Sequence, residues 1–297
     1  MRSGSVALVT DSTAEIHALD PGSEWHVVPL ELEIDGRRLK EGPELSADEF
    51  HRLFQRVNTV PATLPPSIDA FASAYAPLLA RHDAVLSIHL SGGLSDTVLH
   101  AREAARRLGA ADLVTIVDSR LAGLALGLLC REAETRLAEG ATVGETKADL
   151  DRIIAACRVY FSVFTLDFLY LSGRLARSSR PDQAAAGASH AADDRPILTL
   201  ENGRLSLVER VIGETTRVQR IAELLEGEYG VGEPLIAGSV HAGRRGDEAA
   251  ARLEQALTAA LHPGTAWYRS PLGPVLCAHT GFDVCGIAVY PRRLSKL

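Results

Sequence analysis

The stretch SIHLSGGLSDT, residues 87–97, contains the junction that decides the fold. An apolar run from Ala84 to Leu90 ends abruptly at two glycines and a group of hydroxyl side chains. The residues that follow, 98–108, are expected to form a helix. We therefore expect the stretch to be a strand-to-helix turn, which is the repeating unit of parallel α/β sheets.

Two other parts of the first half repeat this pattern of strand, polar turn and helix. Val6–Val9 runs into Thr10-Asp11-Ser12-Thr13, and Leu113–Val117 runs through Asp118-Ser119 into an apolar helix around 121–137. Strands that alternate with helices predict a parallel, doubly wound sheet. Ligands of such sheets bind beyond the carboxyl ends of the strands. Since three strand ends here supply hydroxyls and an acid, we expect a ligand site at that edge.

Further elements are expected between these units. Residues 28–34 alternate apolar and polar side chains, which predicts a half-exposed strand that ends in a turn at Asp35-Gly36. Helices are expected over 46–57 and 67–79, because each stretch begins at a serine cap and continues with apolar residues at helical spacing.

In the second half the expected strands no longer alternate regularly with helices, which predicts a mixed α+β domain. We expect an α/β domain of residues 1–156, followed by an α+β domain of residues 157–297. Asn202-Gly203 is typical of a hairpin turn. The stretch 178–194 is rich in small and polar residues without periodicity. The expected elements are a helix over 246–261 and strands over 159–164, 197–200, 205–211, 234–240, 266–269, 274–278 and 286–290.

Composition narrows the class of protein. Of the 297 residues 46% are hydrophobic and 23% are charged, as is typical of a globular protein with a buried core. The net charge of -7 argues against nucleic-acid binding, because nucleic-acid binders present basic surfaces. The first residues lack the apolar core of a signal peptide, and no apolar stretch approaches the roughly 20 residues that span a bilayer. The four cysteines show no zinc spacing, so we expect buried thiols in a cytoplasmic protein without stable membrane insertion.

Ser95 is open to three interpretations. Gly93-Leu94-Ser95-Asp96-Thr97 resembles the G-x-S-x-G elbow that presents a nucleophilic serine, although Thr97 replaces the second glycine. A turn rich in hydroxyls and backbone N–H groups also suits a carboxylate or phosphate ligand. The third interpretation is a simple helix cap.

Two further residues suit an anionic ligand. His279 precedes a Thr-Gly turn at the end of an apolar run, where a strand end would present its imidazole. Arg174 would pair either with an anion or with a surface acid. The sequence has no P-loop, no G-x-G-x-x-G at a strand end and no HExxH, so neither a nucleotide nor a metal is expected.

Eight short motifs occur in the order seen in the DegV family, over essentially the whole chain. They are TDST (10–13), VPLELEIDG (28–36), TLPPS (63–67), IHLSGGLSDT (88–97), VDS (117–119), LDFLYLSGRL (166–175), VHAG (240–243) and GPVLCAHTG (273–281). No single motif is decisive, and their shared order makes the resemblance specific. The chain thus resembles the DegV family, which implies a two-domain fatty-acid-binding protein.

The resemblance also implies how the ligand is held. Hydroxyls matching Thr63 and Ser95 would bind the carboxyl group, the imidazole matching His279 would lie nearby, and the tail would fill an apolar slot. A carboxylate accepts up to about four hydrogen bonds, which suits this set of donors. Family members that act as the FakB component present the acyl chain to a separate kinase, so a fatty-acid kinase is the implied partner.

Two acids depart from the family pattern. Asp96 stands where the family commonly has glycine, and Phe282-Asp283 replaces Pro-Gly after the His-Thr-Gly motif. An acid that pointed into the site would oppose a bound carboxylate, because like charges repel.

We interpret the chain as a non-enzymatic binder of a long-chain fatty acid, with no catalytic residue, no metal and no cofactor beyond the bound acid. The expected ligand-binding residues are Thr63, Ser95, His279, Arg174, Ser12, Thr13, Gly92 and Gly93. A second interpretation is a serine hydrolase with Ser95 as nucleophile, His279 as base and Asp118 or Asp11 as the orienting acid. A third is a ligand-free regulatory scaffold, which the acidic substitutions suggest.

Overall fold

Two main sheets and a small third sheet organise the computed structural model, which describes residues 5–19, 22–56, 60–175, 194–230 and 232–297. All strands of the first sheet are parallel and follow the order β2-β1-β6-β7. They are β1 (Val6–Asp11), β2 (His26–Val28), β6 (Ala84–His89) and β7 (Val114–Asp118). The predicted parallel sheet is confirmed.

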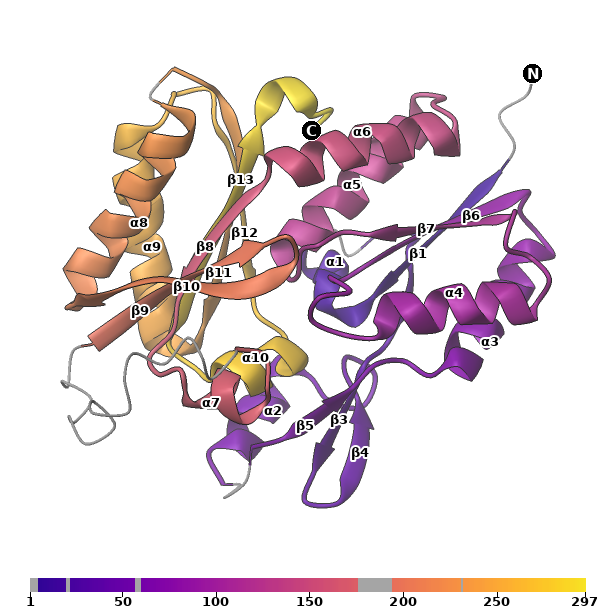
Figure 1. Ribbon diagram of the computed structural model, residues 1–297, viewed down its shortest axis with the longest axis horizontal. Coiled ribbons are helices and arrows are strands. Elements are labelled where there is room, and N and C mark those ends of the chain that lie inside the picture. Colours follow the sequence, from indigo (N-terminus) through magenta and orange to yellow (C-terminus); the bar gives the residue numbers. More distant parts are fainter. Residues whose placement is uncertain (1–4, 20–21, 57–59, 176–193, 231) are drawn as a thin grey trace.

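Helices cover both faces of this sheet (Figure 1). α3 (Ile68–Leu79) and α4 (Thr97–Arg107) pack on one face, and α5 (Leu124–Ala138) packs on the other. Neighbouring residues of β6 divide between the two faces, since Val85 packs with α3 and α4 whereas Leu86 packs with α5. Alternate residues of a strand point to opposite faces, so a strand covered on both sides needs a continuous apolar run. The doubly wound arrangement is therefore confirmed as well.

A small antiparallel sheet, in the order β4-β3-β5, lies at one end of the first sheet (Figure 1). Its strands are β3 (Glu31–Ile34), β4 (Arg37–Lys40) and β5 (Ala62–Leu64). The predicted turn at Asp35-Gly36 joins β3 to β4, with φ angles of 49° and 76° that favour a glycine. α2 (Ala47–Phe54) begins at Ser46, where a capping box satisfies the first backbone N–H groups.

The second main sheet has the order β10-β9-β8-β13-β11-β12 and is mixed, because β11 and β12 are parallel while the other pairs are antiparallel. Its strands are β8 (Arg158–Ser162), β9 (Asp194–Glu201), β10 (Arg204–Ile212), β11 (Leu235–Ala242), β12 (Ala266–Pro271) and β13 (Val284–Pro291). The predicted hairpin turn at Asn202-Gly203 joins β9 to β10.

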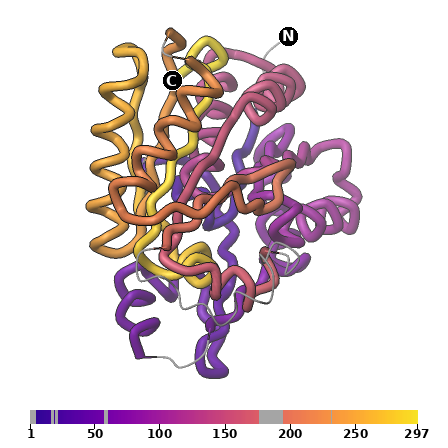
Figure 2. The backbone as a smooth tube through the Cα atoms, turned by 60° about the vertical axis from the view of Figure 1, so that its left-hand side comes forward, coloured from indigo at the N-terminus to yellow at the C-terminus, as the bar shows by residue number. Residues whose placement is uncertain are grey.

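The largest hydrophobic core lies between the two main sheets, around α5. Figure 2 shows α8 (Glu214–Tyr229) and α9 (Gly243–Ala260) on the outer side of the second sheet, away from the first. The inner side of that sheet packs with α5, as the shared cluster of Leu124, Leu198 and Ile236 shows. Because this core draws on both halves of the chain, the predicted boundary between residues 156 and 157 stays a prediction.

One predicted strand is wrong. Residues 274–278 form the start of α10 (Pro274–Thr280), because Pro274 occupies the first turn and a short apolar run fits a buried helix as well as a strand. Most of the stretch 178–194 lies outside the described residues, and only its last residue appears, at the start of β9. Elements that the pattern did not reveal are β2, β4, β5, η1 (Ser12–Ala14), α1 (Ile16–Leu19), α6 (Val143–Ala156), α7 (Asp167–Leu171), α8 and η4 (Arg292–Leu294).

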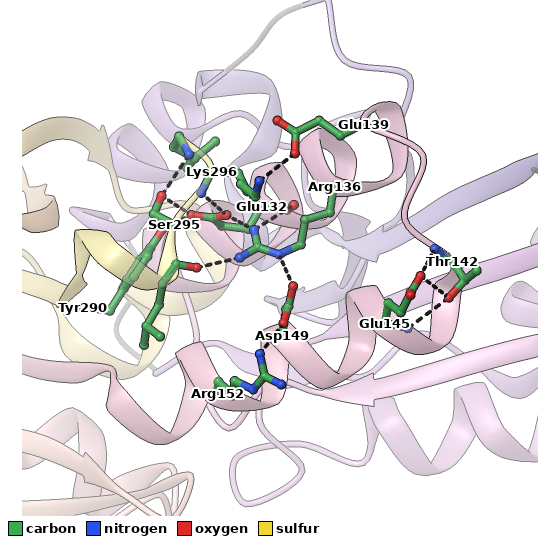
Figure 3. Close-up of polar contacts among 12 residues, drawn as sticks. Glu132, Arg136, Glu139, Thr142, Glu145, Asp149, Arg152, Tyr290, Ser295 and Lys296 are labelled. Carbon is green, nitrogen blue, oxygen red and sulfur yellow. Dashed lines mark hydrogen bonds and ion pairs between the residues drawn. The ribbon is translucent and has the colours of Figure 1, made fainter.

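A buried ion pair fastens the end of the chain to α5 (Figure 3). Glu132 is fully buried and pairs with Arg136, which is 4% exposed. Glu132 also accepts hydrogen bonds from the Tyr290 hydroxyl and the Lys296 N–H, both at 3.0 Å, and from Ser295 Oγ. Arg136 donates to Asp149 of α6 at 3.1 Å and to the Leu294 carbonyl at 2.5 Å. We call these residues the C-terminal clasp.

Candidate functional site

A cavity lies in the core between the two main sheets. Its walls come from the start of α5, the inner face of the second sheet, α7 and α10, together with the turn after β6. Its empty volume is about 960 Å3, which includes space open to solvent. Most wall side chains are aliphatic, and Phe161 is aromatic. Ligand sites are likewise mostly apolar and carry few polar groups.

The polar side chains of the cavity wall include four that the sequence singled out. Thr63, Ser95, Arg174 and His279 line this one cavity, and Thr280 is the remaining polar side chain among the described wall residues. They come from β5, from the turn before α4, from the segment after α7 and from α10. The fold therefore brings together groups that are far apart along the chain.

Thr63 and His279 are in direct contact. The antiparallel pairing of β5 with β3 sets Thr63 opposite Leu32, and Thr63 Oγ1 lies 2.8 Å from His279 Nε2. The sequence predicted that the end of a strand presents His279. In the structure His279 lies in the last turn of α10, so the end of a helix presents it. Burial and, to a smaller extent, the positive charge of Arg174 together lower the pKa of His279 to about 4, so the imidazole is neutral at pH 7. Its Nδ1 is buried and has no hydrogen-bond partner among the described residues.

Ser95 faces the cavity from the turn that precedes α4. Ser95 Oγ lies 2.9 Å from Thr97 Oγ1, and the Ser95 N–H donates to the Ser91 carbonyl at 3.1 Å. The N-cap of α4 is Asp96, so the cap interpretation of Ser95 does not describe this turn. His279 Nε2 contacts Thr63, and no hydrogen bond joins Ser95 to His279 among the described residues.

Arg174 supplies positive charge to the same end of the cavity. Burial lowers its pKa, while the negative charge of Asp96 acts in the opposite direction. Asp96 itself is exposed and does not line the cavity. Asp283 does not line it either, and its N–H donates to the Ala242 carbonyl at 2.8 Å. Neither acid lines the cavity, so any repulsion of a ligand carboxylate acts only from the surface of the protein.

Ser12 and Thr13, two further residues of the predicted site, lie away from the cavity wall. Thr13 is fully buried and donates to the Asp11 carboxylate at 2.6 Å. Ser12 Oγ accepts the N–H of Leu30 at 3.0 Å. These two hydroxyls fix the turn after β1, and we leave them out of the proposed ligand contacts.

Gly92 and Gly93 also lie outside the wall, and their N–H groups have partners within the chain. Gly92 donates to Asp118 Oδ1 and Gly93 donates to Ser91 Oγ, both at 3.0 Å. A Cβ at Gly93 would lie 2.4 Å from the carbonyl oxygen of Gly203 in the β9–β10 turn. Glycine is needed here for the close approach of that turn.

Some wall residues were not foreseen. Gly123 has a φ of 62°, and a Cβ there would lie 3.3 Å from Leu276 Cδ1. Thr280 follows His279 directly, and its position in the His-Thr-Gly motif was the available signal. Gly123, which directly precedes α5, gave no such signal, because a glycine in an apolar stretch looks the same whether it borders a cavity or a filled core.

Within the part of the chain that the structure describes, no group of three or more histidine, cysteine or acidic residues is arranged to hold a metal ion. No helix among those residues has the length and apolar character needed to cross a bilayer.

Comparison with known proteins places the chain in a family. A sequence model of the DegV family, described as an uncharacterised protein family, matches residues 5–292. A DegV domain-containing protein of Deinococcus radiodurans is 32% identical over 293 residues, covering 97% of this chain and 99% of the relative. Protein DegV of Bacillus subtilis is 31% identical over 285 residues, covering 95% of this chain and 98% of the relative.

Solved structures agree with this result. A DegV family protein from Thermus thermophilus, described as fatty-acid binding, matches with a TM-score of 0.85 and 31% identity over 97% of this chain and 99% of its own. DegV of Bacillus subtilis, described as a fatty acid binding protein, matches with a TM-score of 0.82 and 30% identity over 97% of this chain and 100% of its own.

Fold and cavity together define a class, an α/β protein in which a parallel sheet and a mixed sheet enclose an apolar cavity with a few polar side chains. Within that class the chain belongs to the DegV family.

Proposed function

We propose that this protein binds a long-chain fatty acid in the cavity, with the carboxylate among Thr63, Ser95, His279 and Arg174. The observation that carries the proposal is the gathering of these four side chains on the wall of one largely apolar cavity. The relatives from Thermus thermophilus and Bacillus subtilis, described as fatty-acid binding, support the same ligand class.

The chemistry of the cavity suits both ends of such a molecule. A carboxylate accepts hydrogen bonds from hydroxyls and from an imidazole N–H, and Arg174 supplies the opposite charge. His279 Nδ1 lacks a partner among the described residues, so a ligand carboxylate would satisfy it. Burying each methylene of the tail contributes about 0.8 kcal/mol, so ten methylenes contribute about 8 kcal/mol. The tail thus supplies most of the affinity and the polar groups fix the orientation.

Binding without catalysis is part of the proposal. His279 Nε2 contacts Thr63, and Nδ1 has no acid to orient it among the described residues. A fluorophosphonate probe is therefore expected to leave Ser95 unlabelled. Labelling that disappears in the variant Ser95→Ala would favour the hydrolase interpretation instead.

Presentation of the carboxylate to a fatty-acid kinase, in a cytoplasmic location, is the wider role we propose. Ser95 and Arg174 are only partly buried, which supports a carboxylate end near the surface of the protein. Incubation of the loaded protein with a bacterial fatty-acid kinase and ATP should yield an acyl phosphate. Release of unmodified fatty acid only would contradict this wider role without affecting the binding proposal.

Native mass spectrometry of protein purified from cells tests the binding itself. We expect a co-purified acyl species, and we expect added palmitate to stabilise the emptied protein by about 2.7 kcal/mol at a hundred times its Kd. A ligand-free protein whose unfolding midpoint does not respond to any added fatty acid would overturn the proposal and favour the scaffold interpretation.

A further inference from the structure

Two carboxyl groups, the buried one of Glu41 and the half-buried one of Glu15, meet at the start of α10, outside the residues that the proposed function uses. Glu15 follows η1, and its Oε1 accepts the Gly273 N–H at 2.6 Å. Glu41 follows β4, and its Oε1 accepts the Val275 N–H at 2.8 Å. The two acids thus bind backbone groups two residues apart, and they attach α10 to two separate segments of the N-terminal half.

The two carboxyl groups are close to each other. A Cβ placed on Gly273 would lie 2.7 Å from Glu41 Oε1 and 2.8 Å from Glu15 Oε1, so both oxygens crowd the same point. Glu41 is 4% exposed, and its Oε2 is buried without a hydrogen-bond partner among the described residues. A bare carboxylate oxygen in that position is costly, whereas a protonated carboxyl group beside a second carboxylate is not.

The titration behaviour of the two acids agrees with this geometry. Burial raises the pKa of Glu15 well above its ordinary value, and the Glu41 charge raises it further, against the effect of the Gly273 N–H. Burial raises the pKa of Glu41 to about 7, although the nearby Ser12 hydroxyl and the hydrogen bond from the Val275 N–H act in the opposite direction. Two acids in such proximity titrate as a pair.

The surrounding groups do not neutralise the pair. Asp11 at the end of β1 adds negative charge, and the buried Cys277 thiol faces the pair from α10. Glu15, Glu41 and His26 line a second cavity, and burial lowers the pKa of His26, which disfavours its charged form. That cavity has no lysine or arginine among its described wall residues, so a shared proton is what remains to offset the charge.

The helix that the pair holds is also a wall of the proposed ligand cavity. Val275, Leu276, His279 and Thr280 of α10 all line it. A change at the first turn of this seven-residue helix therefore reaches both the apolar wall and the imidazole.

We propose that Glu15 and Glu41 share one proton and thereby hold the start of α10 in place, so that loss of the proton loosens the cavity wall and speeds ligand release. The last step rests on the proposed fatty-acid function. The direction follows from linkage: an acid with a higher pKa in the folded chain stabilises the fold at low pH. That stability is lost as the pH rises from the ordinary value of 4.5 through about 7.

Stopped-flow release of cis-parinaric acid, a fluorescent fatty acid, tests the proposal. Between about pH 5.5 and about pH 8.5 the release rate of the wild-type protein is expected to rise about fivefold. The pKa of His279, at about 4, lies below this window. Glu41→Gln keeps an acceptor for Val275 and adds an amide donor, so it mimics the protonated acid and should release slowly at every pH. The exposed Glu44 lies in the same segment, and Glu44→Gln should keep the wild-type rise.

Hydrogen exchange of the amides of residues 273–281 tests the pair even if no fatty acid binds. After correction for the intrinsic pH dependence, their protection should fall about fivefold over the same range in the wild type and stay constant in Glu41→Gln. Glu15→Gln provides the same comparison should Glu41→Gln not fold. A wild type without any pH-dependent change, or a change that persists in the glutamine variants, would overturn the proposal. Failure of parinaric acid to bind, with this exchange pattern intact, would instead count against the proposed function.

Discussion

The C-terminal clasp is a set of mostly buried polar side chains and the cavity holds a set of partly buried ones, and the two sets differ in how their hydrogen-bonding groups are satisfied. In the clasp, Glu132 and Arg136 find partners within the chain, in α5, α6 and the last residues (Figure 3). In the cavity, His279 Nδ1 has no partner among the described residues. Buried polar groups are normally hydrogen-bonded, so an exception calls for an explanation.

This difference distinguishes polar groups that stabilise the fold from polar groups that are available to a ligand. A closed network contributes to holding segments together and offers nothing to a ligand, since each donor already has an acceptor. An open set leaves hydrogen-bonding capacity for a molecule that arrives later. The comparison predicts that changes in the clasp alter stability and changes in the cavity alter affinity.

The largest effect is expected from Glu132→Ala. It leaves Arg136 buried without its main partner, which costs about 3 to 5 kcal/mol of unfolding free energy. Urea denaturation measures this loss. The matched control is Asp151→Ala, which breaks the exposed pair with Lys147 and should cost less than about 1 kcal/mol. An equal loss in both variants would mean that the clasp is no stronger than a surface pair.

The next largest effect is expected from a substitution that fills space in the cavity where the fatty-acid tail would lie. Ala288 of β13 is 4% exposed and lines the cavity, so Ala288→Leu would occupy space needed by the ligand. Displacing about three methylenes costs about 2.4 kcal/mol, which corresponds to an affinity about 50-fold lower for palmitate. Titration calorimetry with palmitate and a shorter acid checks this. A uniform loss for both chain lengths would show that the substitution acts on the fold and not on the tail.

Thr63→Val should have a smaller effect, and it tests the polar end alone. Valine keeps the shape of threonine but removes the hydroxyl that contacts His279, so we expect palmitate affinity to fall about tenfold. The unfolding free energy of the empty protein should change by less than about 1 kcal/mol. Thr258→Val, in α9 and remote from the cavity, is the control. Unchanged affinity in Thr63→Val would remove this hydroxyl from the proposed site.

The sequence predicted the elements that have a clear period and missed what depends on tertiary contact. Parallel strands and the Asn202-Gly203 hairpin were predicted, because continuous apolar runs and turn residues are local signals. The run 274–278 was misassigned, since a short apolar segment does not distinguish a strand from a helix. Pro274 in the first turn was the local signal for the helix.

The polar residues of the site show the same limit. Thr63 and His279 are 216 residues apart in the sequence, and only the ordered motifs of a family suggested that they belong together. Glu15 and Glu41 gave no sequence signal, because their proximity arises where two loops meet α10. Spacing reveals partners within one element, and packing between elements decides the rest.

The smallest effect is expected from Asp96→Asn, at the border between the open cavity and the surface. Asp96 is exposed but close enough to favour the charged form of Arg174. Arg174 stays charged at neutral pH with or without it. Removing the acid therefore removes repulsion of a ligand carboxylate, and palmitate affinity should rise about twofold at low ionic strength.

High salt should abolish this gain, because solvent-exposed charges are screened. Asp112→Asn makes the same charge change at an exposed position outside the cavity wall, and it should leave palmitate affinity unchanged at either ionic strength. A loss of affinity in Asp96→Asn would reverse the argument, since it would mean that this acid is needed to hold Arg174 toward the ligand. Arg174 would then already have a partner in Asp96, as the polar groups of the clasp have partners within the chain.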